Sequence, residues 1–256
     1  MDNISKEYLI KLLEKGKRID GRKFDEIRNI DISYDVSKHA EGSARVKFGD
    51  TEVIVGVKLE VGEPFPDKLD EGTIIVGAEM LPLSSPDFES GPPSIDSIEL
   101  SRVVDRAIRE SKAIDLKKLC IVEGEKVWIV LIDIYTINNC GNLQDASSLA
   151  ALAALKQAKI PEYDGKNVSY KNKNEKLPLV SLPIECSITK IKDKLLTDPS
   201  LEEEKMMDAR LTVGITESGE ICAMQKGGKG VLTIEDVSKM IDISLKNSEK
   251  IRKLLK

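Results

Sequence analysis

The chain has 256 residues, of which 41% are hydrophobic, and its formal net charge at pH 7 is -5. This size allows one large or two small domains with a buried core, and the acidic balance argues against binding nucleic acid over the whole surface. The four cysteines form no C-x-x-C pair and His39 is the single histidine, so neither a zinc site nor a Ser-His-Asp triad is indicated. No apolar run reaches the roughly 18 residues of a membrane span, and no signal segment follows Met1. We therefore expect a cytoplasmic protein with no membrane partner.

Periodic patterns predict the elements of the first 81 residues. Residues 4–16 have the spacing of a short amphipathic helix. Apolar and polar residues alternate over 30–36, 44–48 and 53–59, and the turn FGDTE joins the last two runs into an antiparallel hairpin. A fourth strand is predicted at 73–81, before the loop PLSSPDFESGPPS.

The middle of the chain reads as helix, strand and helix. An amphipathic helix is predicted over 98–114, and the nearly continuous apolar run 127–137 predicts a strand buried on both faces. The turn NNCGNLQD at 138–145 then leads into a helix from Asp145 to about Ala158.

The last third repeats this logic on a smaller scale. Strands are predicted at 179–191, 208–215 and 220–225. A closing helix begins at Thr233, which can form a capping box with Asp236. Strands and helices in two similar groups indicate an α+β fold of mixed antiparallel sheets, with helices packed on one face. The polar, turn-rich segment 161–178 marks the boundary between a first subdomain, 1–160, and a second, 161–256.

Three arginines lie on one face of the predicted helix 98–114. Arg102, Arg106 and Arg109 are spaced at i, i+4 and i+7, so their guanidinium groups project together. Ion pairing with Asp105 and Glu110 would explain a solvent face, but exposed pairs of this kind contribute under about 1 kcal/mol and would suit lysine equally. The arginine fork matches phosphate oxygens, so binding of RNA or phosphate is the alternative.

A cluster of carboxylates precedes the strand at 208–215. The segment TDPSLEEEKMMDAR, residues 197–210, has enough acids to suggest a divalent metal site, and a solvated charged turn is the other explanation. Arg210 would repel a divalent ion, so we expect no metal there. The loop QKGGKG at 225–230 is glycine-rich and basic but lacks the spacing of a nucleotide-binding loop.

The turn at 138–145 raises a question about anion binding. A strand that turns through a glycine into a helix often holds a phosphate, because the first helical N–H groups are unpaired. Here the turn contains no Lys or Arg, and Asp145 stands where the helix begins.

Several segments in register resemble the RNase PH family of phosphate-dependent 3′ to 5′ exoribonucleases. They are RIDGR at 18–22, GSARVKFGDTEVIVGVK at 42–58, the arginine-bearing helix, the strand and helix around NNCGNLQDAS, and the acidic segment leading into DARLTVGIT. The resemblance implies an RNase PH-type fold, similar to domain 2 of ribosomal protein S5. It is strongest to the ring subunit of the archaeal exosome that is not itself catalytic.

The chain departs from the active members of this family at the positions that carry catalysis. In those members the turn resembles D-G-G-T-R-T-A-S, and its arginine holds the attacking phosphate. Alignment places Gln144 at that arginine and Asn142 at the second glycine. Two aspartates six residues apart are replaced by Glu204 and Arg210. The resemblance therefore implies a vestigial phosphate site and vestigial acid positions.

The resemblance also implies a partner and a role. A catalytic RNase PH-type subunit would alternate with this chain in a ring of three heterodimers, joined by RNA-binding cap proteins, and single-stranded RNA would contact Arg102 and Arg106, with Arg109 a weaker match. Phosphate and magnesium would be needed only at the partner's site, so no cofactor is expected here. Two alternatives stay open. One is a self-sufficient phosphorolytic enzyme that uses Glu204 and Asp208 with a lysine of the loop 225–230, and the other is a scaffold without RNA contact.

Overall fold

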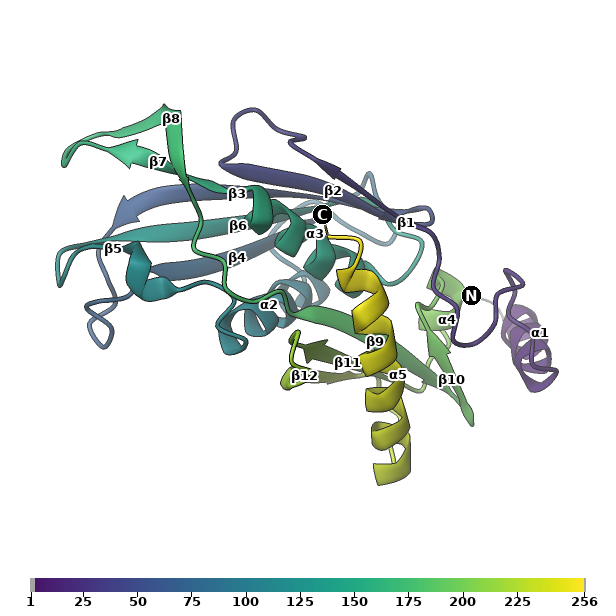
Figure 1. Ribbon diagram of the computed structural model, residues 1–256. Helices are drawn as coiled ribbons and strands as arrows, with labels where there is room; N and C mark the ends of the chain where they lie inside the picture. The colour runs from purple at the N-terminus through teal and green to yellow at the C-terminus, as the bar shows by residue number, and fades with distance from the viewer. Residues whose placement is uncertain (1–2, 256) are drawn as a thin grey trace.

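The computed structural model describes residues 3–255, apart from the side chains of residues 3–6 and 172–174. Two large sheets with helices between them form most of the molecule (Figure 1). The larger sheet has the order β1-β2-β3-β6-β4, and a short β5 also pairs with β6. Its strands are β1 (Ile30–Tyr34), β2 (Gly42–Phe48), β3 (Thr51–Gly62), β4 (Thr73–Met80), β5 (Cys120–Val122) and β6 (Lys126–Asn138). Neighbours are antiparallel except β4, which runs parallel to β6 because α2 lies in the connection between them. The predicted β2–β3 hairpin is confirmed.

Helices α2 (Ile95–Glu110) and α3 (Leu143–Gln157) cover one face of this sheet, and the 3-10 turn Leu116–Leu119 follows α2. The prediction that the strand 127–137 is buried on both faces was wrong. In β6 fully buried residues alternate with half-buried ones, because no helix within residues 3–255 packs on the outer face. Helix α2 also begins three residues before the predicted start, since Ser94 caps it by accepting a hydrogen bond from the Ser97 N–H.

The smaller sheet has the order β10-β9-β11-β12 and is entirely antiparallel. It consists of β9 (Ile184–Ile191), β10 (Lys194–Thr197), β11 (Ala209–Ile215) and β12 (Ile221–Gly227). Helix α5 (Ile234–Arg252) covers one face and starts with the predicted capping box of Thr233 and Asp236. The α5 face is apolar, with Ile188, Val213 and Met240 in one buried cluster.

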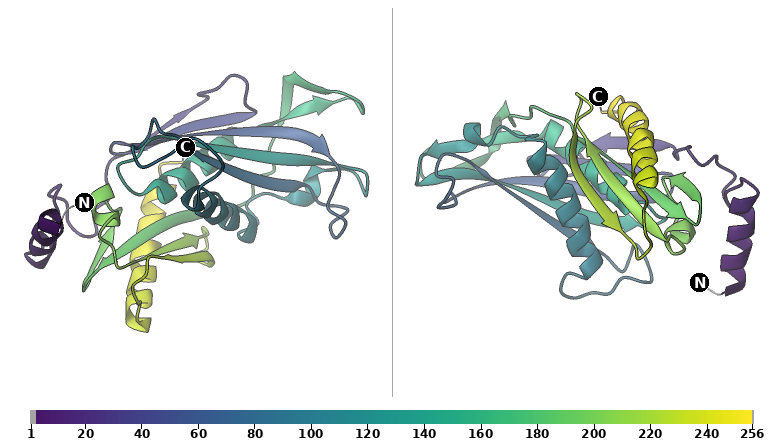
Figure 2. Two further views of the ribbon diagram at one scale, coloured as in Figure 1. Left: turned by 180° about the vertical axis from the view of Figure 1, so that it is seen from behind. Right: turned by 90° about the horizontal axis from the view of Figure 1, so that it is seen from below.

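The other face of the smaller sheet packs on α2 and α3 (Figure 2). This interface is buried but polar. The Ser187 N–H donates to Asp145, and Thr212 donates to Gln144. The molecule therefore has the layer order sheet, helices, sheet, helix, and the two sheets share the middle layer. Sheets and helices in two such groups confirm the predicted α+β class.

Three smaller elements complete the fold. Helix α1 (Asn3–Glu14) lies at the edge of the molecule, where Leu13 packs with residues of β9 and β10. Strands β7 (Lys159–Tyr163) and β8 (Val168–Lys176) form a hairpin that packs through Tyr163 on Trp128 of β6. Helix α4 (Leu201–Glu204) precedes β11. The predicted boundary at 160 and 161 thus falls inside β7, whereas the smaller sheet begins at β9.

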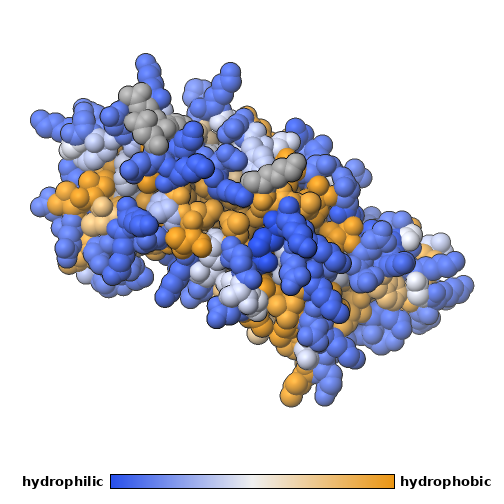
Figure 3. Space-filling model, in the orientation of Figure 1, coloured by the Kyte–Doolittle hydropathy of each residue, from blue (hydrophilic) through white to orange (hydrophobic). Residues whose placement is uncertain are grey.

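The face of the molecule shown in Figure 3 is largely hydrophilic, in line with the 32% of residues that are charged. Within residues 3–255, no helix has both the length and the apolar content needed to span a membrane.

Candidate functional site

The turn between β6 and α3 is shaped by close packing against α4. Gly141 has a φ of +91°, and a Cβ there would lie 2.5 Å from the backbone nitrogen of Leu201, so only glycine fits. Asn142 follows with a φ of 60°, a left-handed conformation that asparagine tolerates. Its N–H donates to Glu204 Oε1 at 2.8 Å. A carboxyl group of the protein itself therefore lies where an anion would approach the start of α3.

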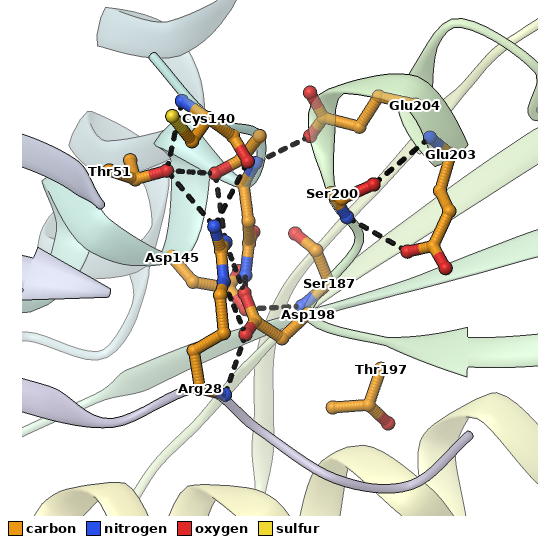
Figure 4. A network of polar contacts seen from close by, with 12 residues as sticks. Arg28, Thr51, Cys140, Asp145, Ser187, Thr197, Asp198, Ser200, Glu203 and Glu204 are labelled. Carbon is orange, nitrogen blue, oxygen red and sulfur yellow. Dashed lines mark hydrogen bonds and ion pairs between the residues drawn. The ribbon is translucent and has the colours of Figure 1, made fainter. Parts of the chain in front are cut away.

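Arg28 holds this turn from the other side (Figure 4). Its guanidinium donates to the carbonyl oxygens of Cys140 and Gly141 at 2.9 and 3.0 Å, and pairs with Asp198 at 2.7 Å. Asp198 is 1% exposed and also accepts from the Asn142 amide at 2.8 Å. Burial acts to raise the pKa of Asp198, but the hydrogen bonds and the charge of Arg28 outweigh it and hold the pKa below its ordinary value.

The RIDGR segment belongs to the same buried network. Arg18 is fully buried and binds Glu203 with Nε at 2.9 Å and Nη2 at 2.5 Å, while Arg22 pairs with Asp198 at 2.9 Å. These arginines attach the N-terminal segment to the smaller sheet. Sequence reasoning missed this role for Arg18, Arg22 and Arg28 because their partners lie about 170 to 185 residues away.

Three of the four predicted vestigial positions, Gln144, Glu204 and Arg210, line one pocket of about 270 Å³ between α2, α3 and α4, called the Gln144 pocket below. The fourth, Asn142, is buried and does not line it. Gln144 is 7% exposed, and its Oε1 accepts from Thr212 at 2.8 Å. Arg210 of β11 pairs with Glu99 of α2 at 2.8 Å. The pocket is lined by Met80, Asp87, Phe88, Asp96, Glu99, Leu100, Asn139, Leu143, Gln144, Leu201, Glu204, Lys205, Met207 and Arg210.

Acids outnumber cations in this lining. Four of the lining side chains are Asp or Glu, and two are basic. Each basic group is already ion-paired with an acid of the same pocket: Arg210 with Glu99, and Lys205 with Asp87 at 2.7 Å. Among the described residues that line the pocket, no cation is left unpaired, so an incoming phosphate would meet net negative charge.

Two carboxyl groups near the turn, the half-buried Glu204 and the buried Asp145, have raised pKa values. Burial raises the pKa of Glu204 to about 7, against the opposing effects of the Asn142 N–H and the charge of Arg210. Burial likewise raises the pKa of Asp145 to about 6, although its carboxyl accepts from the Ser187 N–H. At both residues the free-energy cost of desolvating the charged carboxylate thus exceeds the stabilisation from its hydrogen bonds.

The acidic segment does not have the arrangement of a divalent metal site. In the part of the chain that the structure describes, no three His, Cys, Asp or Glu side chains gather closely enough to hold a metal. Arg210 stands beside Glu204, and the partner of Asp208 is the Lys192 N–H rather than the pocket. The donor set therefore does not fit magnesium.

Lys226 of the glycine-rich loop points away from the pocket. Lys226 is paired in register with Leu211, whose side chain belongs to the cluster under α5, so Lys226 faces the opposite side of the sheet from Gln144. Its Nζ donates to the carbonyl of Gly228 at 2.7 Å. This geometry gives no support to Lys226 as a replacement for the missing phosphate arginine.

The three arginines of α2 are exposed on the outer side of the helix, as the spacing predicts. Arg109 is paired with Asp105 at 2.6 Å and donates to the carbonyl of Ile74. Arg106 donates to Gln225 of β12 at 3.2 Å. Arg102 makes no hydrogen bond or ion pair with any described residue. Among the three arginines of α2, Arg102 and Arg106 thus have no ion-pair partner within the described residues, and their contact with RNA stays a prediction.

The sequence matches a known protein family. The sequence profiles of the 3′ exoribonuclease family match at residues 26–161 for domain 1 and at residues 181–247 for domain 2. The chain therefore belongs to this family of RNase PH proteins, as its motifs indicate.

Individual proteins of this family are similar to the chain over nearly its whole length. The exosome complex component Rrp42 of Methanothermobacter thermautotrophicus is 48% identical over 98% of this chain and 93% of its own length. Rrp42 of Thermococcus kodakarensis is 46% identical over the whole chain and 96% of its own length. A chain in the solved structure of the Archaeoglobus fulgidus exosome with RNA bound to the active site has a TM-score of 0.93 and 46% identity, covering 99% of this chain and 98% of that one.

Proposed function

We infer that this chain is a non-catalytic subunit of an archaeal-type exosome, a 3′ to 5′ exoribonuclease complex. A catalytic RNase PH-type subunit would pair with it, three such heterodimers would form a ring, and cap proteins that bind RNA would complete the assembly. The relatives named as exosome components cover nearly the whole chain at 46 to 48% identity, and this supports the assignment to the complex.

The observation that carries the non-catalytic assignment is the pairing of both cations in the Gln144 pocket. Phosphorolysis brings one anion against another, so it requires fixed positive charge on the attacking phosphate. Here the amide of Gln144 replaces that charge, and Glu204 already accepts from the Asn142 N–H. Loss of one electrostatic donor typically slows catalysis by about 10² to 10³. The loss of a phosphate arginine and of an acid from one site is therefore incompatible with efficient turnover.

The role in RNA binding rests on α2. Arg102 and Arg106 project from the exposed face of a helix whose other face is buried, so they are held on a rigid element. Contacts from guanidinium groups to phosphates are independent of base sequence, which suits a degrader that must accept many RNAs. We assign these two arginines to the RNA, with a smaller contribution from Arg109.

A reconstitution assay tests the function. The purified chain, given single-stranded RNA with phosphate and magnesium, should release no nucleoside diphosphate. An equimolar mixture with the RNase PH-type chain of the same cell should release it. The mass of the mixture, measured by light scattering, should correspond to three copies of each chain.

The outcomes separate the candidates. Turnover by the lone chain would support the self-sufficient enzyme instead, and a mixture that degrades RNA without forming a common complex would remove this chain from the machinery. The cytoplasmic location stays a prediction that tagging in cells can check.

A further inference from the structure

Glu99 lines the Gln144 pocket beside its arginine. It lies on α2, one turn before Arg102, and its carboxylate reaches into the pocket to pair with Arg210 Nη2 at 2.8 Å. Arg210 is only 9% exposed, and its guanidinium lies against the backbone of Gly227, where an added Cβ would be 2.8 Å from Nη2. The cation is therefore fixed in place, and Glu99 is its single ion-pair partner among the described residues.

Without Glu99 the pocket would have the components of an anion site. Arg210 would contribute a fixed guanidinium. Gln144 would contribute its amide nitrogen, which makes no hydrogen bond with any described residue, whereas its Oε1 accepts from Thr212. Both groups line the same pocket, which has room for a phosphate at about 270 Å³. A guanidinium and an amide are both hydrogen-bond donors suited to phosphate oxygens.

We propose that Glu99 closes a latent anion site and so keeps RNA phosphates out of this subunit's pocket. This rests on the proposed function, in which RNA is held by Arg102 and Arg106 on the same helix. An RNA 3′ end that those arginines hold would pass close to the pocket, since α2 carries both. The acid then acts as a repulsive specificity element that leaves the 3′ end free for the partner's sites.

The neighbouring groove strengthens this exclusion. It lies between the end of β4 and the loop at 82–94, adjoins the pocket through Met80, Asp87, Phe88 and Asp96, and has no Lys or Arg in its lining. Its acids are Glu79, Asp87, Glu89 and Asp96. A phosphate chain approaching from this side would meet four acidic side chains and no basic one in this lining.

The test measures binding of inorganic phosphate to the full-length isolated chain by ³¹P NMR titration. Glu99→Gln should raise the affinity for phosphate at least tenfold over the wild type. The double variant Glu99→Gln with Arg210→Met should lose that gain. Glu89→Gln removes one charge from the adjoining groove without freeing a cation, and as the matched control it should change the affinity less than twofold.

Three results would overturn the proposal: no gain in Glu99→Gln, a gain that survives loss of Arg210, or an equal gain in Glu89→Gln. If Glu99→Gln does not fold, Asp87→Asn is the second variant, because it frees the exposed Lys205 at the rim of the same pocket. A gain of threefold or more there supports exclusion by charge, and no gain refutes it. Because the readout is phosphate binding by one chain, its failure is distinct from failure of the reconstitution assay.

Discussion

Replacing Arg102 and Arg106 with Met should weaken RNA binding in a way that salt can measure. Arg102 makes no hydrogen bond or ion pair with any described residue, and Arg106 would give up one hydrogen bond to Gln225 on binding RNA. Each lost phosphate contact to a single strand reduces the magnitude of the slope of log affinity against log salt by about 0.7. The slope of the double variant should therefore be smaller in magnitude than that of the wild type by about 1.4. Between 50 and 200 mM salt, the affinity of the wild type should then fall about sevenfold more than that of the variant.

The assay is fluorescence anisotropy of a labelled single-stranded RNA bound to the assembled complex, without phosphate so that the RNA is not degraded. Arg109→Met is the matched control, because its guanidinium is already bound to Asp105 and to the Ile74 carbonyl. It should lower the slope by less than about 0.7. Equal slopes for wild type and double variant, or an Arg109 effect as large as that of the pair, would refute the assignment of RNA contact to Arg102 and Arg106.

Two further predictions concern stability. Arg28→Met should reduce the free energy of unfolding in urea by about 3 kcal/mol, because it leaves the buried Asp198 with Arg22 as its remaining ion-pair partner, and a loss below about 1 kcal/mol would contradict the network. Glu204→Gln tests the raised pKa of about 7. The folded state keeps the Glu204 proton after the unfolded chain has lost it, so the wild type should lose stability relative to this variant as pH rises from about 4.5 to about 7, by about 1–3 kcal/mol. A difference between the two that does not change with pH would show that Glu204 titrates normally.

Local patterns predicted most elements of the fold. The β2–β3 hairpin and the capping box of Thr233 and Asp236 depend on neighbouring residues, and both are present. The start of α2 was missed because Ser94 lies in a Pro- and Gly-rich stretch that reads as loop. The exposure of β6 was missed because a continuous apolar run does not show whether a second layer will cover it.

Part of the candidate site could likewise be predicted from the sequence, and part of it could not. The composition of the turn, with Gln144 in place of a cation, could be read from the chain and already argued against phosphate binding. The pairing of Arg210 with Glu99 could not be read from the chain, because the two residues are 111 positions apart and meet only when α2 packs against the smaller sheet. The Arg28 network was likewise invisible, since its acid lies 170 residues away.

What the sequence determined by itself was therefore chemical identity: which charges the turn and the acidic segment possess, and which family their order matches. Only the tertiary structure decided how those charges are used. An ion pair depends on a separation of a few ångströms, and packing of the shared helical layer brings Glu99, Arg210 and Glu204 to one pocket. In that pocket the positive charge of Arg210 is neutralised by Glu99.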